Sequence, residues 1–70
     1  PNASFLYYNR ACYLAISGNT DDAFVDVVRA AKLNPSYISY AEKDEDLESV
    51  RKLPGYETLK LLLRQEQKDE

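Results

Sequence analysis

Apolar residues recur three or four positions apart in two consecutive segments of this 70-residue chain, and a glycine or a proline follows each segment. The first segment is placed at residues 4–17 by Tyr7, Ala11 and Leu14. The second shows the same spacing and ends at Leu33. Side chains three or four residues apart share one face of an α-helix, so both segments are predicted to be helices.

Three breaks divide the chain. Gly18 is predicted to end the first helix in a left-handed conformation, which glycine adopts readily. Asn34-Pro35 is predicted to end the second helix, because the residue before a proline avoids helical geometry. Pro54-Gly55 is predicted to break the chain again before a last helix that begins at about Tyr56.

The helix starts carry residues that suit the N-cap position. Thr20 is predicted to cap the second helix, and Ser36 is predicted to cap a short third helix that ends near Glu42. A further helical turn or two is expected around Leu47 and Val50. The apolar residues predicted to face inward in the second half are Tyr37, Tyr40, Ala41, Leu47, Val50, Tyr56, Leu59, Leu62 and Leu63.

Composition narrows the classes of fold and function. With only two glycines and three prolines, the chain has too few turn residues for an all-β fold, and the pattern predicts an all-α antiparallel stack. The net charge of −3 and the lack of a basic stripe argue against a nucleic-acid partner. The longest apolar run, Leu61–Leu63, is too short to span a membrane.

Catalytic and metal chemistry is not expected. The chain has no histidine, so Cys12 lacks the usual general base, and a small core or groove residue is the better interpretation. A single cysteine also fits a reducing compartment, which favours a cytoplasmic location. An EF-hand loop starting at Asp44 fails, because Ser49 stands where glycine is needed and Gly55 where the closing glutamate belongs. A helix start with Asp44 or Asp46 as its cap is expected instead, and we predict no metal, cofactor or enzymatic activity.

Residues 4–37 resemble one tetratricopeptide repeat, which has a period of about 34 residues. In the first helix the family's large aromatic, small and bulky residues match Tyr7, Ala11 and Leu14, and its turn glycine matches Gly18. In the second helix its small, bulky and small residues match Ala23, Val27 and Ala30, and its closing proline matches Pro35. The run from Asn9 to Tyr13 is similar to an Asn-x-Ala-Cys-Tyr variant of the family, and Arg10 departs from its usual leucine. The resemblance implies a helix hairpin of tetratricopeptide type.

Residues 38–70 do not repeat this pattern. Their acidic start, their Leu-Glu-Ser-Val-Arg core and their Pro-Gly-Tyr start to the last helix resemble the segment that often follows a final repeat. Such a cap covers the open end of a repeat array. We therefore expect residues 1–70 to form one domain at the end of an α-α superhelix. Because the chain begins at Pro1 without a methionine, we also expect it to be part of a longer protein.

The resemblance implies a protein-interaction module that binds another protein or an extended peptide. In this family the asparagine at the place of Asn9 often bonds the backbone of a bound peptide, although it could equally bond a neighbouring helix or water. The groove stripe Phe5, Tyr8, Cys12 and Ile16 could line the same site, unless a preceding repeat packs over it, which is favoured for Phe5.

Two other functions stay open at this point. One is an architectural cap or homodimerisation element, joined through Leu61 and the open face of the first helix. The other is a regulatory appendage of an enzyme whose catalytic part lies upstream.

Overall fold

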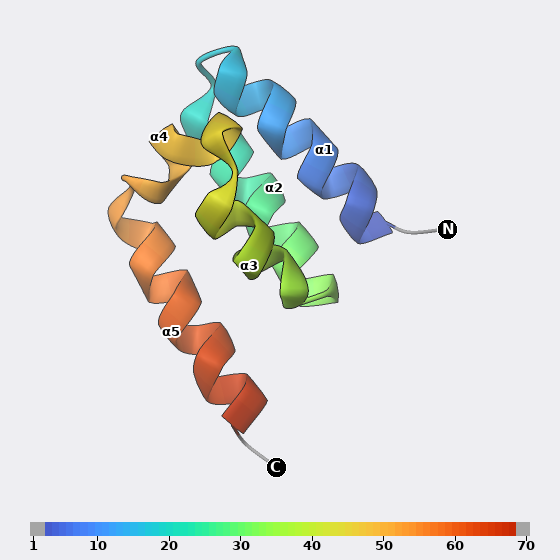
Figure 1. Ribbon diagram of the computed structural model, residues 1–70, viewed down its shortest axis with the longest axis vertical. Coiled ribbons are helices and arrows are strands. Elements are labelled where there is room, and N and C mark those ends of the chain that lie inside the picture. The colour runs from blue at the N-terminus through green and yellow to red at the C-terminus, as the bar shows by residue number, and fades with distance from the viewer. Residues whose placement is uncertain (1–2, 69–70) are drawn as a thin grey trace.

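The computed structural model describes the backbone of residues 3–68 and the side chains of residues 3–64. Within these residues the chain forms only helices and turns, so the predicted all-α fold is confirmed (Figure 1). The elements, in chain order, are α1 (Ala3–Ile16), α2 (Thr20–Leu33), α3 (Ser36–Lys43), the 3-10 helix η1 (Glu45–Leu47), α4 (Glu48–Arg51) and α5 (Pro54–Lys68). None of the helices in this described part has the length and apolar character needed to cross a bilayer.

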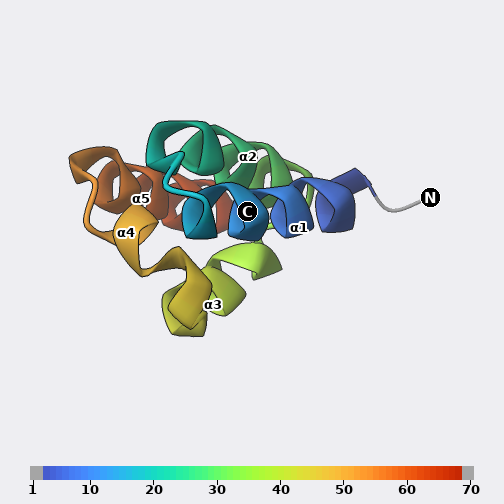
Figure 2. The same cartoon turned by 90° about the horizontal axis from the view of Figure 1, so that it is seen from above.

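Helix α2 is the centre of the stack. It pairs with α1 as a hairpin and also packs against α3, α4 and α5, while η1 packs against α1. In Figure 1, α1 and α5 lie on opposite sides of α2, and Figure 2 shows α3 below the α1–α2 pair. Helix α5 thus folds back along the chain and packs onto α2.

The turn between α1 and α2 depends on Gly18, whose φ of 89° confirms the predicted left-handed conformation. The amide of Gly18 donates to the Ala15 carbonyl at 3.1 Å, and the amide of Asn19 donates to the Leu14 carbonyl at 2.8 Å. These two bonds form a Schellman motif, which satisfies the last carbonyls of α1. The hairpin therefore begins with a backbone geometry that glycine allows at little cost.

Both predicted N-caps are wrong. Thr20 is already inside α2, with Asn19 before it, and its hydroxyl donates to Ser49 Oγ of α4 at 3.3 Å. Ser36 is the first residue of α3, and its amide donates to the side chain of Asn34 at 3.1 Å. Each hydroxyl lies one position too late to cap its helix.

The predicted break at Pro54-Gly55 is also wrong, because these two residues begin the first turn of α5. Proline is favoured at the first helical position, where its missing N–H would have no partner within the helix. Gly55 lets α5 approach α2 closely, since a Cβ at this position would lie 3.2 Å from the Phe24 ring. The change of chain direction falls instead at Lys52 and Leu53.

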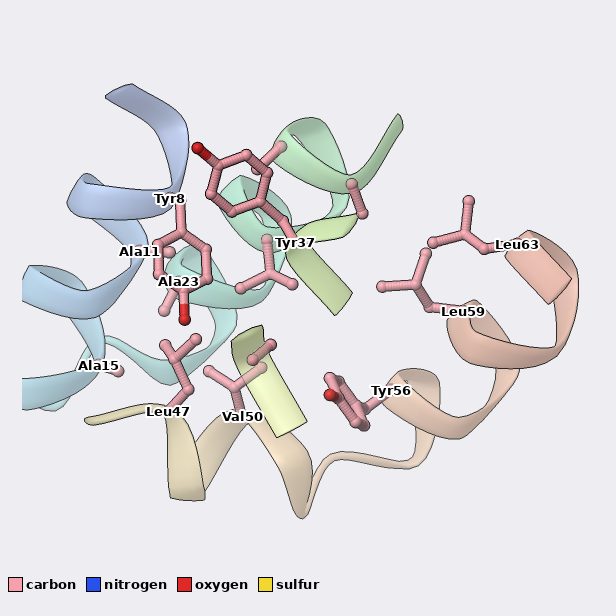
Figure 3. Close-up of a cluster of buried hydrophobic side chains, with 14 residues drawn as sticks. Tyr8, Ala11, Ala15, Ala23, Tyr37, Leu47, Val50, Tyr56, Leu59 and Leu63 are labelled. Atoms are coloured by element: carbon pink, nitrogen blue, oxygen red, sulfur yellow. The ribbon is translucent and has the colours of Figure 1, made fainter. Parts of the chain in front are cut away.

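The core combines small side chains between α1 and α2 with larger ones from the C-terminal half. Ala11, Ala23, Ala30 and Ala31 are fully buried and allow the two helices to approach closely. Figure 3 shows Leu59 and Leu63 of α5 at one side of the cluster. The remaining buried apolar residues are Tyr8, Ala15, Val27, Tyr37, Ala41, Leu47, Val50 and Tyr56.

Two residues predicted to face inward, Tyr40 and Leu62, are more than half exposed. Helix α3 has only two turns, and its inward positions are Tyr37 and Ala41, so Tyr40 lies at the edge with its ring centre 5.2 Å from that of Tyr37. Helix α5 buries a single stripe that includes Leu59 and Leu63, and Leu62 lies to one side of it.

Arg51 joins the short elements of the C-terminal half. Its Nη1 donates to the carbonyls of Ala41 and Asp44, each at 2.6 Å. These carbonyls lie at the end of α3, where a helix leaves its last acceptors without intrahelical donors. One guanidinium therefore satisfies the end of α3 and holds α4 beside it.

Candidate protein-interaction surface

Asn9 lies on the solvent side of α1, and its side-chain amide makes no hydrogen bond to any residue that the structure describes. The hydrogen-bond donors and acceptor of this carboxamide are thus available to a partner. Its predicted contact with a bound peptide stays a prediction.

Tyr8 and Cys12, predicted to line the same groove, lie under the C-terminal half of the chain. The Tyr8 hydroxyl donates to Asp44 Oδ2 at 2.8 Å, and the Cys12 thiol lies 3.5 Å from the same oxygen. The Tyr8 ring is 5.0 Å from that of Tyr37, centre to centre. The chain itself occupies this part of the predicted groove.

The same contacts determine the ionisation of these groups. Burial, strengthened by the Asp44 carboxylate, raises the pKa of Cys12 to about 12 and also raises the pKa of Tyr8. Burial alone would raise the pKa of Asp44, but hydrogen bonds from Tyr8, the Asp46 amide and Cys12 outweigh it and lower that pKa. At neutral pH the carboxylate is therefore charged, while the thiol and the hydroxyl stay protonated.

Phe5 and Ile16, the other two predicted groove residues, are exposed on either side of Asn9 along α1. The structure adds Leu6 and Tyr13 to this surface, two residues that sequence reasoning did not assign to it. Tyr13 is 69% exposed, Ile16 67% and Leu6 64%. We call Leu6, Asn9, Tyr13 and Ile16 the outer face of α1. Their spacing of three, four and three was the signal for a second face of the helix.

No charged side chain belongs to this outer face. Arg10 is the single charged residue of α1, and it pairs with Asp26 of α2, with Nε–Oδ2 and Nη2–Oδ1 distances of 2.6 and 3.0 Å. Arg29 Nη1 donates to the same carboxylate at 3.1 Å, and both guanidinium groups lie within 6 Å of the centre of the Tyr7 ring. Arg10 thus has a buried ionic partner that the sequence analysis did not predict.

Asp26 is only 2% exposed, so both arginines hold a nearly buried charge. The hydrogen bond from Arg10 lowers the pKa of Asp26, and burial acts in the opposite direction. An aspartate within the apolar stripe of the second helix was the sequence signal for this ion cluster. Its geometry joins α1 to α2 and favours a structural role.

A groove of about 490 Å³ lies between α3 and α5, and the sequence analysis did not predict it. Glu42 accepts hydrogen bonds from the Tyr56 hydroxyl at 2.6 Å and from Lys60 at 3.3 Å, which link its walls. These bonds lower the pKa of Glu42 despite partial burial. The groove is lined by Pro35, Ser36, Ile38, Ser39, Glu42, Lys60, Leu63 and Arg64.

Cys12, Asp44 and Asp46 place three potential metal-ligand atoms within 4.8 Å of one another. The Asp44 carboxylate is already engaged, because its Oδ1 accepts from the Asp46 amide at 3.0 Å and its Oδ2 from Tyr8. The first of these bonds caps η1 and confirms the predicted helix start at Asp44. The cluster is therefore explained by capping and by the contact between α1 and η1.

Comparisons of this chain with protein-family models, with curated proteins and with solved structures find no match.

Proposed function

We propose that this chain is a protein-interaction module, built as one tetratricopeptide-type hairpin at residues 4–37 with a C-terminal cap at residues 38–70. Two antiparallel helices of equal length, joined by a left-handed glycine and packed through buried alanines, support this assignment. The third helix packs on α2 after Pro35, as a following repeat element would.

The outer face of α1 is the observation that carries the proposal. Three large apolar side chains surround an asparagine whose amide has no partner among the described residues, and the helix bears no other charge than the paired Arg10. An exposed apolar patch of this kind marks an interaction site more often than a random surface does. Asn9 would supply directional hydrogen bonds within an apolar contact.

Binding without catalysis fits the chemistry of the chain. The sequence has no histidine, and the thiol pKa of about 12 leaves Cys12 almost wholly protonated at neutral pH. A protonated thiol is a poor nucleophile.

A matched pair of leucine substitutions tests the proposal. Leu6 and Leu33 are similarly exposed, at 64% and 61%, but only Leu6 belongs to the outer face of α1. Random peptides displayed on phage would be selected on the immobilised chain, and their affinities measured by fluorescence anisotropy for the wild type, Leu6→Glu and Leu33→Glu. We expect Leu6→Glu to weaken binding by about tenfold or more, because it puts a charge into an apolar contact. Leu33→Glu should bind as the wild type does.

Asn9→Ala should weaken the same peptides a few-fold, in keeping with the loss of about 1 kcal/mol per hydrogen bond. Peptides that bind Leu6→Glu and the wild type equally well would show that the outer face is not the binding surface. A selection that recovers no binders would count against the module as a whole.

A further inference from the structure

The side chains on the outer face of α1 are arranged so that two copies of this face can fit against each other. Around the helix, Leu6 and Tyr13 lie on one side of Asn9, and Ile16 and the half-exposed Phe5 lie on the other side, at opposite ends of the face. Along the axis, Leu6 precedes Asn9 by three residues and Tyr13 follows it by four. Leu6 and Tyr13 are thus nearly equidistant from Asn9.

The distribution of charge limits which surfaces of this chain can form a symmetric contact with a second copy. The chain has a net charge of −3, and a symmetric interface brings the same residues of two copies together. Helix α2 begins with the exposed pair Asp21 and Asp22, and α5 exposes Glu57 and Arg64. The outer face of α1 contains no charged residue, so two such faces can meet without repulsion or the desolvation of an ion.

An antiparallel arrangement matches the side chains of two copies. With a two-fold axis at Asn9, Leu6 of one copy comes within about one residue rise, or 1.5 Å, of the level of Tyr13 in the other. On the other side of the axis, Ile16 comes within about three residue rises, or about 4.5 Å, of the level of Phe5 in the other copy. Each pair brings an aliphatic side chain against an aromatic ring, which buries apolar surface from both copies.

Asn9 lies on the symmetry axis in this arrangement. A carboxamide carries both donors and an acceptor, so two of them can form a reciprocal pair of hydrogen bonds. A single asparagine within an apolar helix contact is known to specify register and orientation. Asn9 would therefore determine how the two copies align.

We propose that the outer face of α1 is covered by the same face of a second copy of this chain, in an antiparallel pair centred on Asn9. This inference rests on the proposed function and names the partner of that surface. The exposed parts of Leu6, Asn9, Tyr13 and Ile16 amount to on the order of 500 Å² per copy, given about 150–250 Å² for a whole aromatic side chain. A total near 1,000 Å² is at the lower limit of a specific interface, so the pair should be weak and concentration-dependent.

Sedimentation equilibrium over a wide concentration range tests the pair. The weight-average mass of the wild type should rise from 8.0 kDa toward twice that value. Leu6→Glu should stay at the monomer mass, whereas Leu33→Glu should behave as the wild type does, with circular dichroism confirming that both variants are folded. A wild type that stays monomeric throughout would overturn the pair, as would loss of association in Leu61→Glu and not in Leu6→Glu.

A cysteine at the axis tests the register. In a Cys12→Ser background, Asn9→Cys should form an intermolecular disulfide at least about tenfold faster than Leu33→Cys, because facing positions at the centre of a helix pair lie within disulfide range. Equal rates would overturn the two-fold axis at Asn9. A negative result in either experiment would not contradict the proposed function, because peptide binding that depends on Leu6 requires no second copy. The peptide selection tests that function separately.

Discussion

The α1–α2 hairpin and the C-terminal half bury their apolar surface in different ways. The hairpin uses alanines at its crossing, which leave no room for larger side chains. The C-terminal half uses large residues, including Leu47, Tyr56 and Leu59, which cover what the hairpin leaves open. The hairpin should therefore be sensitive to added volume, and the C-terminal half to lost volume.

The hairpin and the C-terminal half also differ in the polar contacts that hold them together. A buried ion cluster around Asp26 joins the two hairpin helices. The C-terminal half is attached through tyrosine hydroxyls that donate to Asp44 and Glu42, and through Arg51 bonded to backbone carbonyls. Acid should affect both regions, because each includes a carboxyl group with a lowered pKa.

The largest effect should follow from removing α5. Truncation after Pro54 deletes Tyr56, Leu59 and Leu63, all of which are buried. At about 1.5–3 kcal/mol for each buried large side chain, the loss approaches the whole stability of a small domain. We expect no cooperative thermal transition by circular dichroism. Truncation after Arg64, which keeps these three residues, is the control, and a cooperative transition in both chains would show that α5 is not a cap.

Added volume in the hairpin should have the next largest effect. Ala11→Leu should lower the free energy of unfolding by about 1–3 kcal/mol, because Ala11 is fully buried at the helix crossing. The same substitution at Ala3, which is exposed on the same helix, is the matched control for helix propensity. Equal stability of the two variants in urea would contradict close packing at Ala11.

Acid should weaken the ion cluster of the hairpin. The pKa of Asp26 is lower in the folded chain than its ordinary value of 3.8, so its stabilising effect is complete above that value and is lost as the pH falls below it. Asp26→Asn should cost about 1–2 kcal/mol at neutral pH, since the two arginines remain solvated and no buried charge is left alone. Urea titrations at neutral and acid pH should show a smaller loss on acidification for Asp26→Asn than for the wild type. The loss of stability that Asp26→Asn still shows on acidification would come from Asp44 and Glu42. If Asp26→Asn and the wild type have the same pH dependence, the ion cluster does not stabilise the hairpin.

The two glycines should respond least, and for different reasons. Gly18→Val should cost about 1–2 kcal/mol because of its positive φ alone, as a Cβ there meets no atom within 4 Å. Gly55→Ala gains up to about 1 kcal/mol of helix propensity but brings a methyl group against the Phe24 ring, so its melting temperature should change little. An unchanged melting temperature for Gly18→Val would mean that the turn adopts another conformation at little cost.

The hairpin was predictable because its signals are local. Gly18 and Pro35 determine where helices end through their own backbone preferences. The three- or four-residue spacing of Tyr7, Ala11 and Leu14 identifies the packed face of the first helix. Pro54 was misjudged because proline is compatible with both the end and the first turn of a helix. The difference depends on how Gly55 meets Phe24, a contact between distant parts of the chain.

The candidate surface was predictable only in part, because α1 is apolar on both faces. Which face is covered depends on where η1 and α3 pack. The contacts of Asp44 with Tyr8 and Cys12 place the C-terminal half over that side of α1. Ile16 and Leu6 are left exposed for the same reason. The pairing of Arg10 with Asp26 likewise needs two helices in register, which spacing within either helix does not reveal.

The environment of Cys12 makes its thiol a reporter of local opening. With a pKa of about 12 and a neighbouring carboxylate, the thiol should react very slowly with alkylating reagents while α1 and η1 are in contact. When they separate, its pKa returns toward the ordinary value of 9.0 and the reaction accelerates. The alkylation rate of the native chain therefore measures how often this contact opens, as amide hydrogen exchange does for backbone groups.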